Sequence, residues 1–206
     1  MNQPAMNQPV GKRRIIGLTG GIATGKSTVS DYLARQYGLP ILDADEYSRE
    51  AVAKGSVILE RIRDRYGPEI LLPDDALNRV NLGQIIFNDD NEKTWLEQQI
   101  HPFVRNRFAE ITAETPLGQA LVYSIPLLFE ANLTHLVSEI WVVACSPEQQ
   151  KERLMARNHL FSSDAQARMD AQMDLTEKCR QADIVLDNSG AKESLFSQVD
   201  DALGMT

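Results

Sequence analysis

A short segment near the start of the chain has the residue types and spacing of a phosphate-binding loop. Residues 20–27 read Gly-Gly-Ile-Ala-Thr-Gly-Lys-Ser and fit the pattern G-x-x-x-x-G-K-[ST]. The apolar run 14–19 predicts a buried strand before the loop, and apolar residues at helical spacing follow it until Gly38. Because glycines let backbone N–H groups and a helix N-terminus face an anion, this context favours a phosphate site over an ordinary turn.

The loop predicts that the chain binds a nucleoside triphosphate. Lys26 is expected to reach the β- and γ-phosphates, and the Ser27 hydroxyl is expected to hold Mg²⁺. The other loop residues expected to contact the nucleotide are Gly21, Ile22, Ala23, Thr24, Gly25 and Thr28.

Composition sets the class of protein. The chain has 206 residues, of which 43% are hydrophobic, enough for one buried core with insertions. Its formal net charge of −8 argues against non-specific binding of nucleic acid.

No apolar run approaches the ~20 residues that span a bilayer, so we expect a soluble, cytoplasmic protein without a membrane partner. Residues 1–13 repeat Met-Asn-Gln-Pro without the apolar stretch of a secretory signal, and we expect a disordered lead there. The oligomeric state stays open.

Five short apolar runs alternate with helical patterns and predict a parallel sheet flanked by helices, an α/β fold. Right-handed connections bring the carboxyl ends of such strands to one edge of the sheet, where functional residues are expected to gather. The expected strands are 14–19, 40–42, 119–125, 139–144 and 183–186.

An insertion separates the second and third strands. Residues 46–116 carry apolar side chains at helical spacing and predict a helical subdomain, which leaves 14–45 and 117–206 as the nucleotide-binding core. Pro102 is expected to kink one helix or to restart it just after His101, a histidine that we assign to packing and not to catalysis.

Two capping signals predict a helical hairpin late in the chain. One helix opens at Ser146 and the next at Ser163, and residues 153–175 form the predicted lid. A solvated charged face is the plain alternative. The polar residues expected to face one way on these helices are Arg153, Arg157, Arg168 and Gln172.

In this order and spacing, the segments resemble the dephospho-CoA kinase family from about residue 15 to residue 190. Singly, only the phosphate loop is a strong motif, whereas the ordered set is highly specific. The segments that carry the resemblance are 18–22 with 25–28, Asp43-Ala44-Asp45 with Arg49, 82–87, His101-Pro102, 126–130, the four lid residues, Ala182-Asp183 and 187–190.

The resemblance implies a P-loop kinase fold of the nucleoside-monophosphate kinase type, with a helical acceptor-binding insertion and a small helical lid. It implies that ATP, with Mg²⁺, donates its γ-phosphoryl group to the ribose 3′-hydroxyl of dephospho-CoA. The implied catalytic residues are Lys26, Asp45 and Arg157; Arg153 and Arg157 join the nucleotide site, and Asp43, Asp45, Arg49 and Glu130 join the acceptor site.

Several of these roles have structural alternatives. Asp45 stands just past the second expected strand, which we place beside the phosphate-loop strand, where a carboxylate can take the proton of the acceptor hydroxyl. Spacing alone equally allows Asp45 to cap a helix beginning at Glu46, and the resemblance favours catalysis. Asp43 either holds magnesium-bound water or orders the turn. Glu130 either binds acceptor or metal-bound water, or caps a helix.

Two positions depart from the family pattern. The loop usually reads Gly-Gly-Ile-Gly-Ser-Gly-Lys-Ser, so Ala23 is strained if its position needs a positive φ. Ser124 stands where many members of the family carry an acidic residue, which could bind a water ligand of magnesium.

Three other functions compete with this one. A nucleoside or nucleotide kinase of the same fold would share the phosphate loop. A GTP-binding switch is disfavoured because its Asn-Lys-x-Asp guanine motif is missing and the Asp-x-x-G of residues 187–190 follows the last expected strand. A nucleotide-binding protein without turnover would need neither Asp45 nor the lid arginines.

Overall fold

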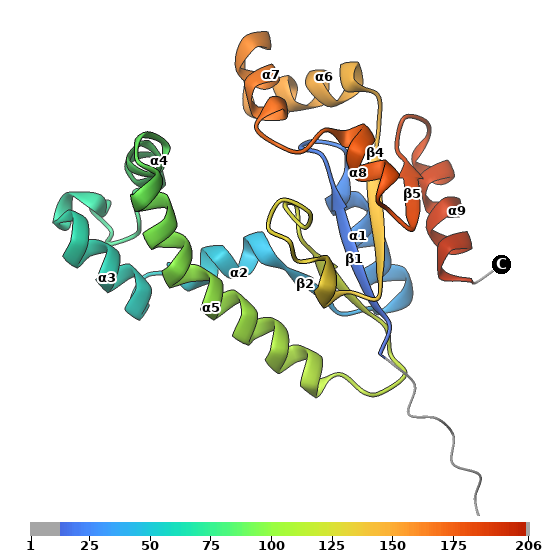
Figure 1. Cartoon of the computed structure of the whole chain (residues 1–206), viewed down its shortest axis with the longest axis horizontal. Coiled ribbons are helices and arrows are strands. Elements are labelled where there is room, and N and C mark those ends of the chain that lie inside the picture. Colours follow the sequence, from blue (N-terminus) through green and yellow to red (C-terminus); the bar gives the residue numbers. More distant parts are fainter. Residues whose placement is uncertain (1–12, 205–206) are drawn as a thin grey trace, which may run out of the picture. The chain divides into compact units, whose positions relative to one another are not determined.

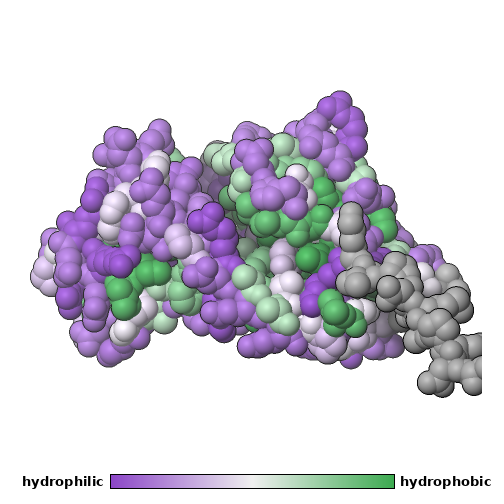
Figure 2. All heavy atoms as spheres, turned by 60° about the horizontal axis from the view of Figure 1, so that its bottom comes forward, coloured by the Kyte–Doolittle hydropathy of each residue, from purple (hydrophilic) through white to green (hydrophobic). Residues whose placement is uncertain are grey.

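The computed structural model describes residues 13–204, so the predicted lead at residues 1–13 lies outside the described part of the chain, except for Arg13. Contacts divide the chain into two units, residues 1–42 with 115–206 and residues 43–114, which we call the core unit and the inserted unit. Among residues 13–204, no helix is both long enough and apolar enough to cross a membrane. The face drawn in Figure 2 is mostly hydrophilic, in keeping with a chain in which 24% of the residues are charged.

The core unit is built on a five-stranded sheet in the order β2-β3-β1-β4-β5 (Figure 1). The pairs β1–β3, β1–β4 and β4–β5 are parallel, which confirms the predicted α/β fold. The strands are β1 (Ile15–Gly20), β2 (Ile41–Asp43), β3 (Leu121–Ser124), β4 (Glu139–Ala144) and β5 (Ile184–Asp187). One expectation is wrong: β3 lies between β2 and β1, so the strand before Asp45 is not beside the phosphate-loop strand.

Both faces of the sheet are covered. On one face, Ile16 and Leu18 of β1 are fully buried and join a hydrophobic cluster with helices α1 (Lys26–Tyr37) and α9 (Lys192–Leu203). On the other face, a side chain at Gly17 would lie 3.2 Å from Leu128, so the loop after β3 packs directly on β1. Alternation along the strand therefore buries both sides, as expected for a parallel sheet.

The remaining helices of the core unit follow β4. They are α6 (Pro147–Asn158), α7 (Ser162–Asp170) and α8 (Leu175–Arg180), with a short 3-10 turn η2 (Thr134–Leu136) before β4. The capping box predicted at Ser146 is confirmed, because its side chain accepts the Gln149 N–H and Gln149 accepts the Ser146 N–H. The cap predicted at Ser163 is wrong: α7 begins one residue earlier, after Phe161, with no side-chain cap.

The inserted unit is helical. It consists of α2 (Ala44–Ala51), α3 (Val57–Tyr66), the 3-10 turn η1 (Pro68–Ile70), α4 (Arg79–Asn88) and α5 (Asp90–Glu114). Its own hydrophobic cluster includes Ile62 and Ile70, both fully buried. Pro102 lies inside α5, which does not restart after His101, so of the two predicted effects of this proline the restart is wrong. A proline leaves one helical carbonyl without its N–H partner, and α5 is long enough to tolerate that loss.

A polar cluster in the inserted unit joins α3 to α5. Glu92 accepts two hydrogen bonds from Arg65, at 2.7 and 2.8 Å, and one from the Tyr66 hydroxyl at 2.5 Å. The Arg65 guanidinium also lies 4.5 Å from the centroid of the Trp95 ring. The bonds from Arg65 and then Tyr66 lower the pKa of Glu92 to about 2.

This cluster predicts acid sensitivity of the inserted unit. A carboxylate with a lowered pKa in the folded state contributes stability above its unfolded pKa of 4.5, and that contribution disappears as the pH falls towards 2. Glu92→Gln is therefore expected to lower the urea midpoint at pH 6 and to change it much less at pH 2.5. Trp95 fluorescence in a Trp141→Phe background follows the transition. Glu60→Gln, at an exposed site on α3, serves as the control; an equal deficit for Glu92→Gln at both pH values would contradict the prediction.

Candidate active site

The phosphate loop lies between the end of β1 and the start of α1, as predicted. Gly25 is the residue before α1 and has φ 102°, a conformation that favours glycine. Gly20 approaches β4 so closely that a side chain there would lie 2.6 Å from the Val143 carbonyl oxygen. Within the loop, the Thr24 N–H donates to the Gly21 carbonyl at 3.2 Å and the Thr24 hydroxyl to the same oxygen at 2.9 Å. The turn is thus fixed by its own backbone and by the neighbouring strand.

The backbone angle of Ala23 shows whether its position needs a positive φ. Its φ is 62°, so the family's usual glycine position does require the left-handed region, and the alanine is strained there. A left-handed conformation costs an L-residue roughly 1–2 kcal/mol.

Ala23→Gly is therefore expected to stabilise the protein. Relief of the strain exceeds the roughly 0.4–1 kcal/mol by which a glycine favours the unfolded chain, so the net gain is up to about 1 kcal/mol. Thermal unfolding should show a rise in Tm of about 2–4 °C. Ala34→Gly, inside α1, is the matched control and should lower Tm because its backbone is already helical. Equal losses in both variants would show that Ala23 carries no strain.

Residues from distant segments hold the loop from outside. Asn188, just after β5, donates from its side chain to the Thr24 carbonyl at 2.8 Å. The backbone carbonyl of Asn188 accepts a hydrogen bond from the Arg153 guanidinium at 2.9 Å. The backbone N–H of Asn188 donates to the Ala144 carbonyl at 2.7 Å. Arg153, predicted to bind nucleotide, thus lies one hydrogen-bonded residue away from the phosphate loop.

Lys26 lies at the first position of α1, and its ammonium donates to the hydroxyl of Ser124. Ser124 is fully buried at the end of β3, the strand that pairs with β1. Ser124 therefore supplies a neutral hydroxyl to the loop lysine. Ser27, predicted to hold Mg²⁺, is exposed beside it.

The predicted lid residues fall into two groups. Arg157 near the end of α6 and Arg168 on α7 are exposed, and Arg157 donates to the side chain of the neighbouring Asn158 at 2.9 Å. Gln172, in the segment after α7, accepts the N–H of Ile22 at 2.8 Å. The structure therefore places Gln172 against the phosphate loop, and Arg153 against Asn188, which supports the loop. Arg157 and Arg168 are exposed and can reach a ligand.

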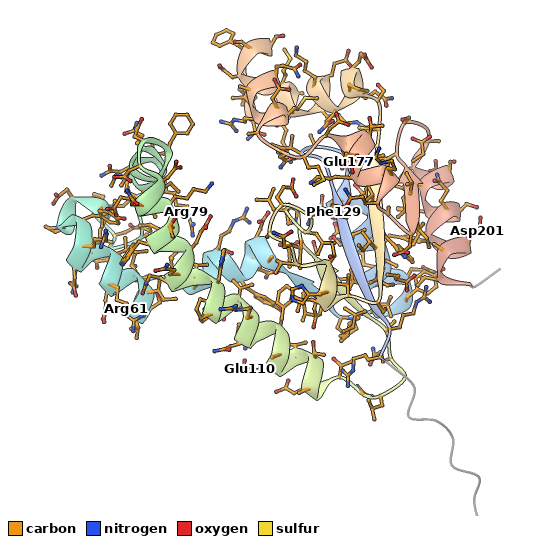
Figure 3. All side chains as sticks on the ribbon, in the orientation of Figure 1. Arg61, Arg79, Glu110, Phe129, Glu177 and Asp201 are labelled. Carbon is orange, nitrogen blue, oxygen red and sulfur yellow. The ribbon has the colours of Figure 1, made fainter. Side chains whose placement is uncertain are left out.

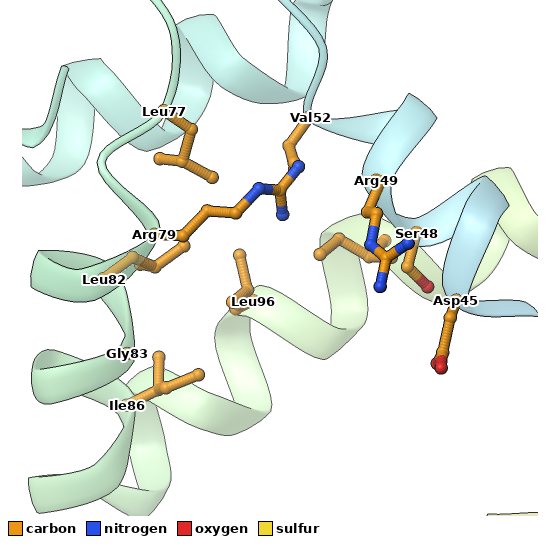
Figure 4. Close-up of a pocket in the computed structure, with 11 residues that line it drawn as sticks. Asp45, Ser48, Arg49, Val52, Leu77, Arg79, Leu82, Gly83, Ile86 and Leu96 are labelled. Atoms are coloured by element: carbon orange, nitrogen blue, oxygen red, sulfur yellow. The ribbon is translucent and has the colours of Figure 1, made fainter. Parts of the chain in front are cut away.

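The acceptor residues from the sequence lie in the inserted unit. Asp45 and Arg49 on α2 line a pocket of about 420 Å³ together with Arg79 at the start of α4 (Figure 4). Its remaining wall is mostly apolar. The apolar lining residues are Val52, Leu77, Leu82, Ile86, Leu96 and Ile100.

Electrostatics distinguish the two pocket arginines from other arginines of the inserted unit. Within the described residues, no hydrogen bond or ion pair engages Arg49 or Arg79. By contrast, Arg65 pairs with Glu92, and Arg107 pairs with Glu50 and Glu110. In a chain of net charge −8, two unpaired guanidinium groups at one pocket form a site suited to an anion.

The helix-cap alternative for Asp45 is wrong. Helix α2 begins at Ala44, and its cap is Asp43, whose side chain accepts the N–H groups of Asp45 at 2.9 Å and Glu46 at 3.2 Å. Asp43 therefore orders the turn, one of its two proposed roles. Asp45 lies in the first helical turn with its exposed carboxylate at the pocket.

Glu130 and several residues missed by the sequence surround the phosphate loop in the core unit. Glu130 pairs with Lys178 at 2.8 Å and accepts the Met173 N–H at 3.0 Å. Gln150 is buried, and a side chain at Gly21 would lie 2.5 Å from its amide nitrogen. Lys178 had no sequence signal because it stands in a short polar helix, whereas Asn188 and Gln172 already belonged to family motifs.

Comparisons with known proteins agree with this geometry. The family model of dephospho-CoA kinase matches residues 14–193. A dephospho-CoA kinase of Trichormus variabilis is 59% identical over 191 residues, 93% of this chain and 97% of that protein. One from Synechocystis is 56% identical over 188 residues, 91% of this chain and 94% of that protein.

Solved structures extend the comparison. A structure from Thermus thermophilus, TT1252, has a TM-score of 0.82 at 32% identity and covers 94% of this chain and 98% of that one. A dephospho-CoA kinase from Campylobacter jejuni has a TM-score of 0.69 at 26% identity, over 94% and 96% of the two chains. A shikimate kinase from Bacteroides thetaiotaomicron, at a TM-score of 0.53 and 16% identity, shares the fold alone. With its phosphate loop, its helical insertion and these relatives, the chain belongs to the dephospho-CoA kinase family and is an ATP-dependent kinase.

Proposed function

We propose that this protein transfers the γ-phosphoryl group of ATP to the ribose 3′-hydroxyl of dephospho-CoA and releases CoA and ADP. Family membership supports this acceptor, and the phosphate loop supports the donor. Phosphoryl transfer needs positioning and neutralisation of charge more than covalent chemistry. The described residues offer cations and one well-placed carboxylate for that purpose.

The pocket of the inserted unit carries the proposal. Dephospho-CoA combines a ribose hydroxyl, a diphosphate and a long arm rich in methylene and amide groups. The pocket combines the exposed carboxylate of Asp45, the unpaired guanidinium groups of Arg49 and Arg79, and an apolar wall. Asp45 would orient the hydroxyl and accept its proton, and the arginines would pair with the diphosphate.

In the core unit, the donor side of the reaction rests on the phosphate loop. The N–H groups of the loop and the ammonium of Lys26 would bind the phosphates of ATP. The residues present fit Mg²⁺, because the exposed Ser27 hydroxyl offers the hard oxygen ligand that this ion prefers, with phosphates as further ligands. The ion would neutralise charge on the β- and γ-phosphates.

Arg157 is proposed to stabilise charge on the transferring group from the lid. Arg157→Ala is expected to lower kcat at least about 10-fold with a smaller change in KM for ATP, because the contact strengthens in the transition state. Arg157→Lys should not fully restore kcat, since an ammonium lacks the bidentate fork. Steady-state kinetics measure both parameters; a rise in KM alone would transfer this role to Arg168 or Arg153.

The reaction itself is tested by following ADP release with a panel of acceptors. ADP should appear with dephospho-CoA and not with CoA, which differs from it only by the phosphate already on the 3′-oxygen. Adenosine, shikimate and gluconate cover rival acceptors of kinases with this fold. ADP release with one of these, and none with dephospho-CoA, would establish a different small-molecule kinase. Binding of ATP with no turnover of any acceptor would favour a nucleotide-binding switch.

A further inference from the structure

Helix α8 of the core unit carries a buried charge that the proposed reaction does not use. Lys178 is fully buried. Its ammonium donates to the Pro126 carbonyl at 3.1 Å and to Glu130 at 2.8 Å. Lysine is almost never fully buried unless it is paired, so this arrangement calls for a reason beyond stability.

Glu130 links this lysine to the end of the lid. The carboxylate oxygen that binds Lys178 also accepts the N–H of Met173 at 3.0 Å. Burial opposes ionisation of Glu130, but the bonds from Lys178 and from the backbone N–H groups of Glu130 and Met173 outweigh it and lower its pKa. The other carboxylate oxygen is buried and has no hydrogen-bond partner among the described residues. Figure 3 labels Phe129 and Glu177, the sequence neighbours of the pair, on the loop after β3 and on α8.

The residue before Met173 touches the phosphate loop. Gln172 accepts the N–H of Ile22 at 2.8 Å, and α7, the second lid helix, ends at Asp170. The short segment that leaves the lid is therefore fixed twice, by Glu130 through its backbone and by the phosphate loop through the Gln172 side chain. Arg168 lies just before this segment, on the last turn of α7.

We propose that Lys178 and Glu130 are positioning residues, which hold Met173 so that Gln172 binds Ile22 and the lid arginines are placed over the bound triphosphate. This inference rests on the proposed kinase function. A buried ion pair contributes little net stability and can often be replaced by apolar residues without loss. An apolar pair, however, offers no acceptor to the Met173 N–H, and that acceptor is what defines the path of the segment.

The first test separates positioning from stability. Gln172→Ala removes only the contact with Ile22 and is expected to lower kcat about 10-fold or more, because small misplacements of catalytic groups are costly, while Tm stays nearly unchanged. Glu130→Met/Lys178→Met replaces the ion pair by an apolar pair and removes the acceptor of the Met173 N–H, so it should lower kcat by a similar factor at a temperature well below its Tm. The dissociation constant for ATP, from calorimetric titration, should change less than about threefold in both.

The second test asks whether the two changes act through one contact. Combining Gln172→Ala with Glu130→Met/Lys178→Met should add no further loss of kcat, since interacting residues are not additive. Amide hydrogen exchange followed by NMR should show loss of protection at Ile22 in every one of these variants. Glu139→Gln is the matched control: Glu139 pairs with Arg14 at 2.5 Å at the opposite end of the sheet, so its loss should lower Tm and leave kcat and Ile22 protection unchanged.

Two results would overturn the proposal. One is wild-type kcat in the folded Glu130→Met/Lys178→Met variant, and the other is wild-type protection of Ile22 in it. If that variant does not fold, Glu130→Asp keeps both charges but shortens the side chain by one methylene, which withdraws the shared oxygen from Met173, and the same two readouts decide. Protection of Ile22 is measured without any acceptor, so it still tests positioning if dephospho-CoA proves not to be the substrate.

Discussion

Lys26→Ala is expected to reduce kcat by roughly 10²–10³-fold or more, while the fold is retained. The physical reason is that Lys26 supplies a positive charge where negative charge accumulates during transfer, and loss of one such preorganised donor has effects of that size. The side chain contributes to neither hydrophobic cluster, and its ammonium donates to the hydroxyl of Ser124. Circular dichroism and Tm measure the fold, and ADP release measures turnover.

A lysine outside the site provides the control for Lys26. Lys192, at the start of α9, lies 5.3 Å from the centroid of the Phe196 ring, and Lys192→Ala should leave kcat unchanged. Turnover near the wild-type value in a folded Lys26→Ala protein would refute the assignment of the phosphate loop.

Asp45→Asn is expected to reduce kcat by roughly 10²–10⁴-fold, the range of general-base contributions. Asparagine keeps the size and hydrogen-bonding shape of the side chain but can neither accept a proton nor attract the acceptor hydroxyl by charge. Because Asp43 caps α2, the loss of the Asp45 charge should cost stability only through the helix dipole, about 0.3–1 kcal/mol. Binding of dephospho-CoA should therefore be largely kept in calorimetric titration.

Glu46 is a well-matched control for Asp45. It is an exposed carboxylate in the same helical turn, and it does not line the pocket. Glu46→Gln should cost a similar, small amount of stability and leave kcat within a few-fold of wild type. Equal kinetic effects of the two substitutions would mean that Asp45 acts through the charge of α2 and not as a base.

Local features of this protein could be predicted from the sequence, and non-local ones could not. The phosphate loop was predictable because its glycines fix a local turn, and the capping box at Ser146 because it joins residues three positions apart. The order of the sheet, with β3 between β2 and β1, depends on pairing between distant segments. The same holds for Lys178, which looks like a surface residue until Pro126 and Glu130 are brought to it.

Some predictions were wrong by only a few residues, yet the difference changed the role assigned to a side chain. The sequence assigned the possible cap of α2 to Asp45, although Asp43 holds it, and a shift of two residues changes which carboxylate faces the pocket. For Ala23, the departure from the family pattern was visible in the sequence, while only the backbone angle showed that the departure costs energy. Such boundaries depend on hydrogen-bond geometry, which residue types alone do not determine.

The inserted unit separates the two segments of the core unit in the sequence, and this order affects how the chain folds during synthesis. Strand β1 spans Ile15–Gly20, yet its sheet partners begin at Leu121 and Glu139. At roughly 5–20 residues per second, a ribosome needs about 5–20 s to make the intervening chain. The inserted unit, which is continuous from residue 43 to 114, can fold within that interval. The apolar residues of β1 must wait unpaired meanwhile, and unpaired strands of this kind are prone to aggregation.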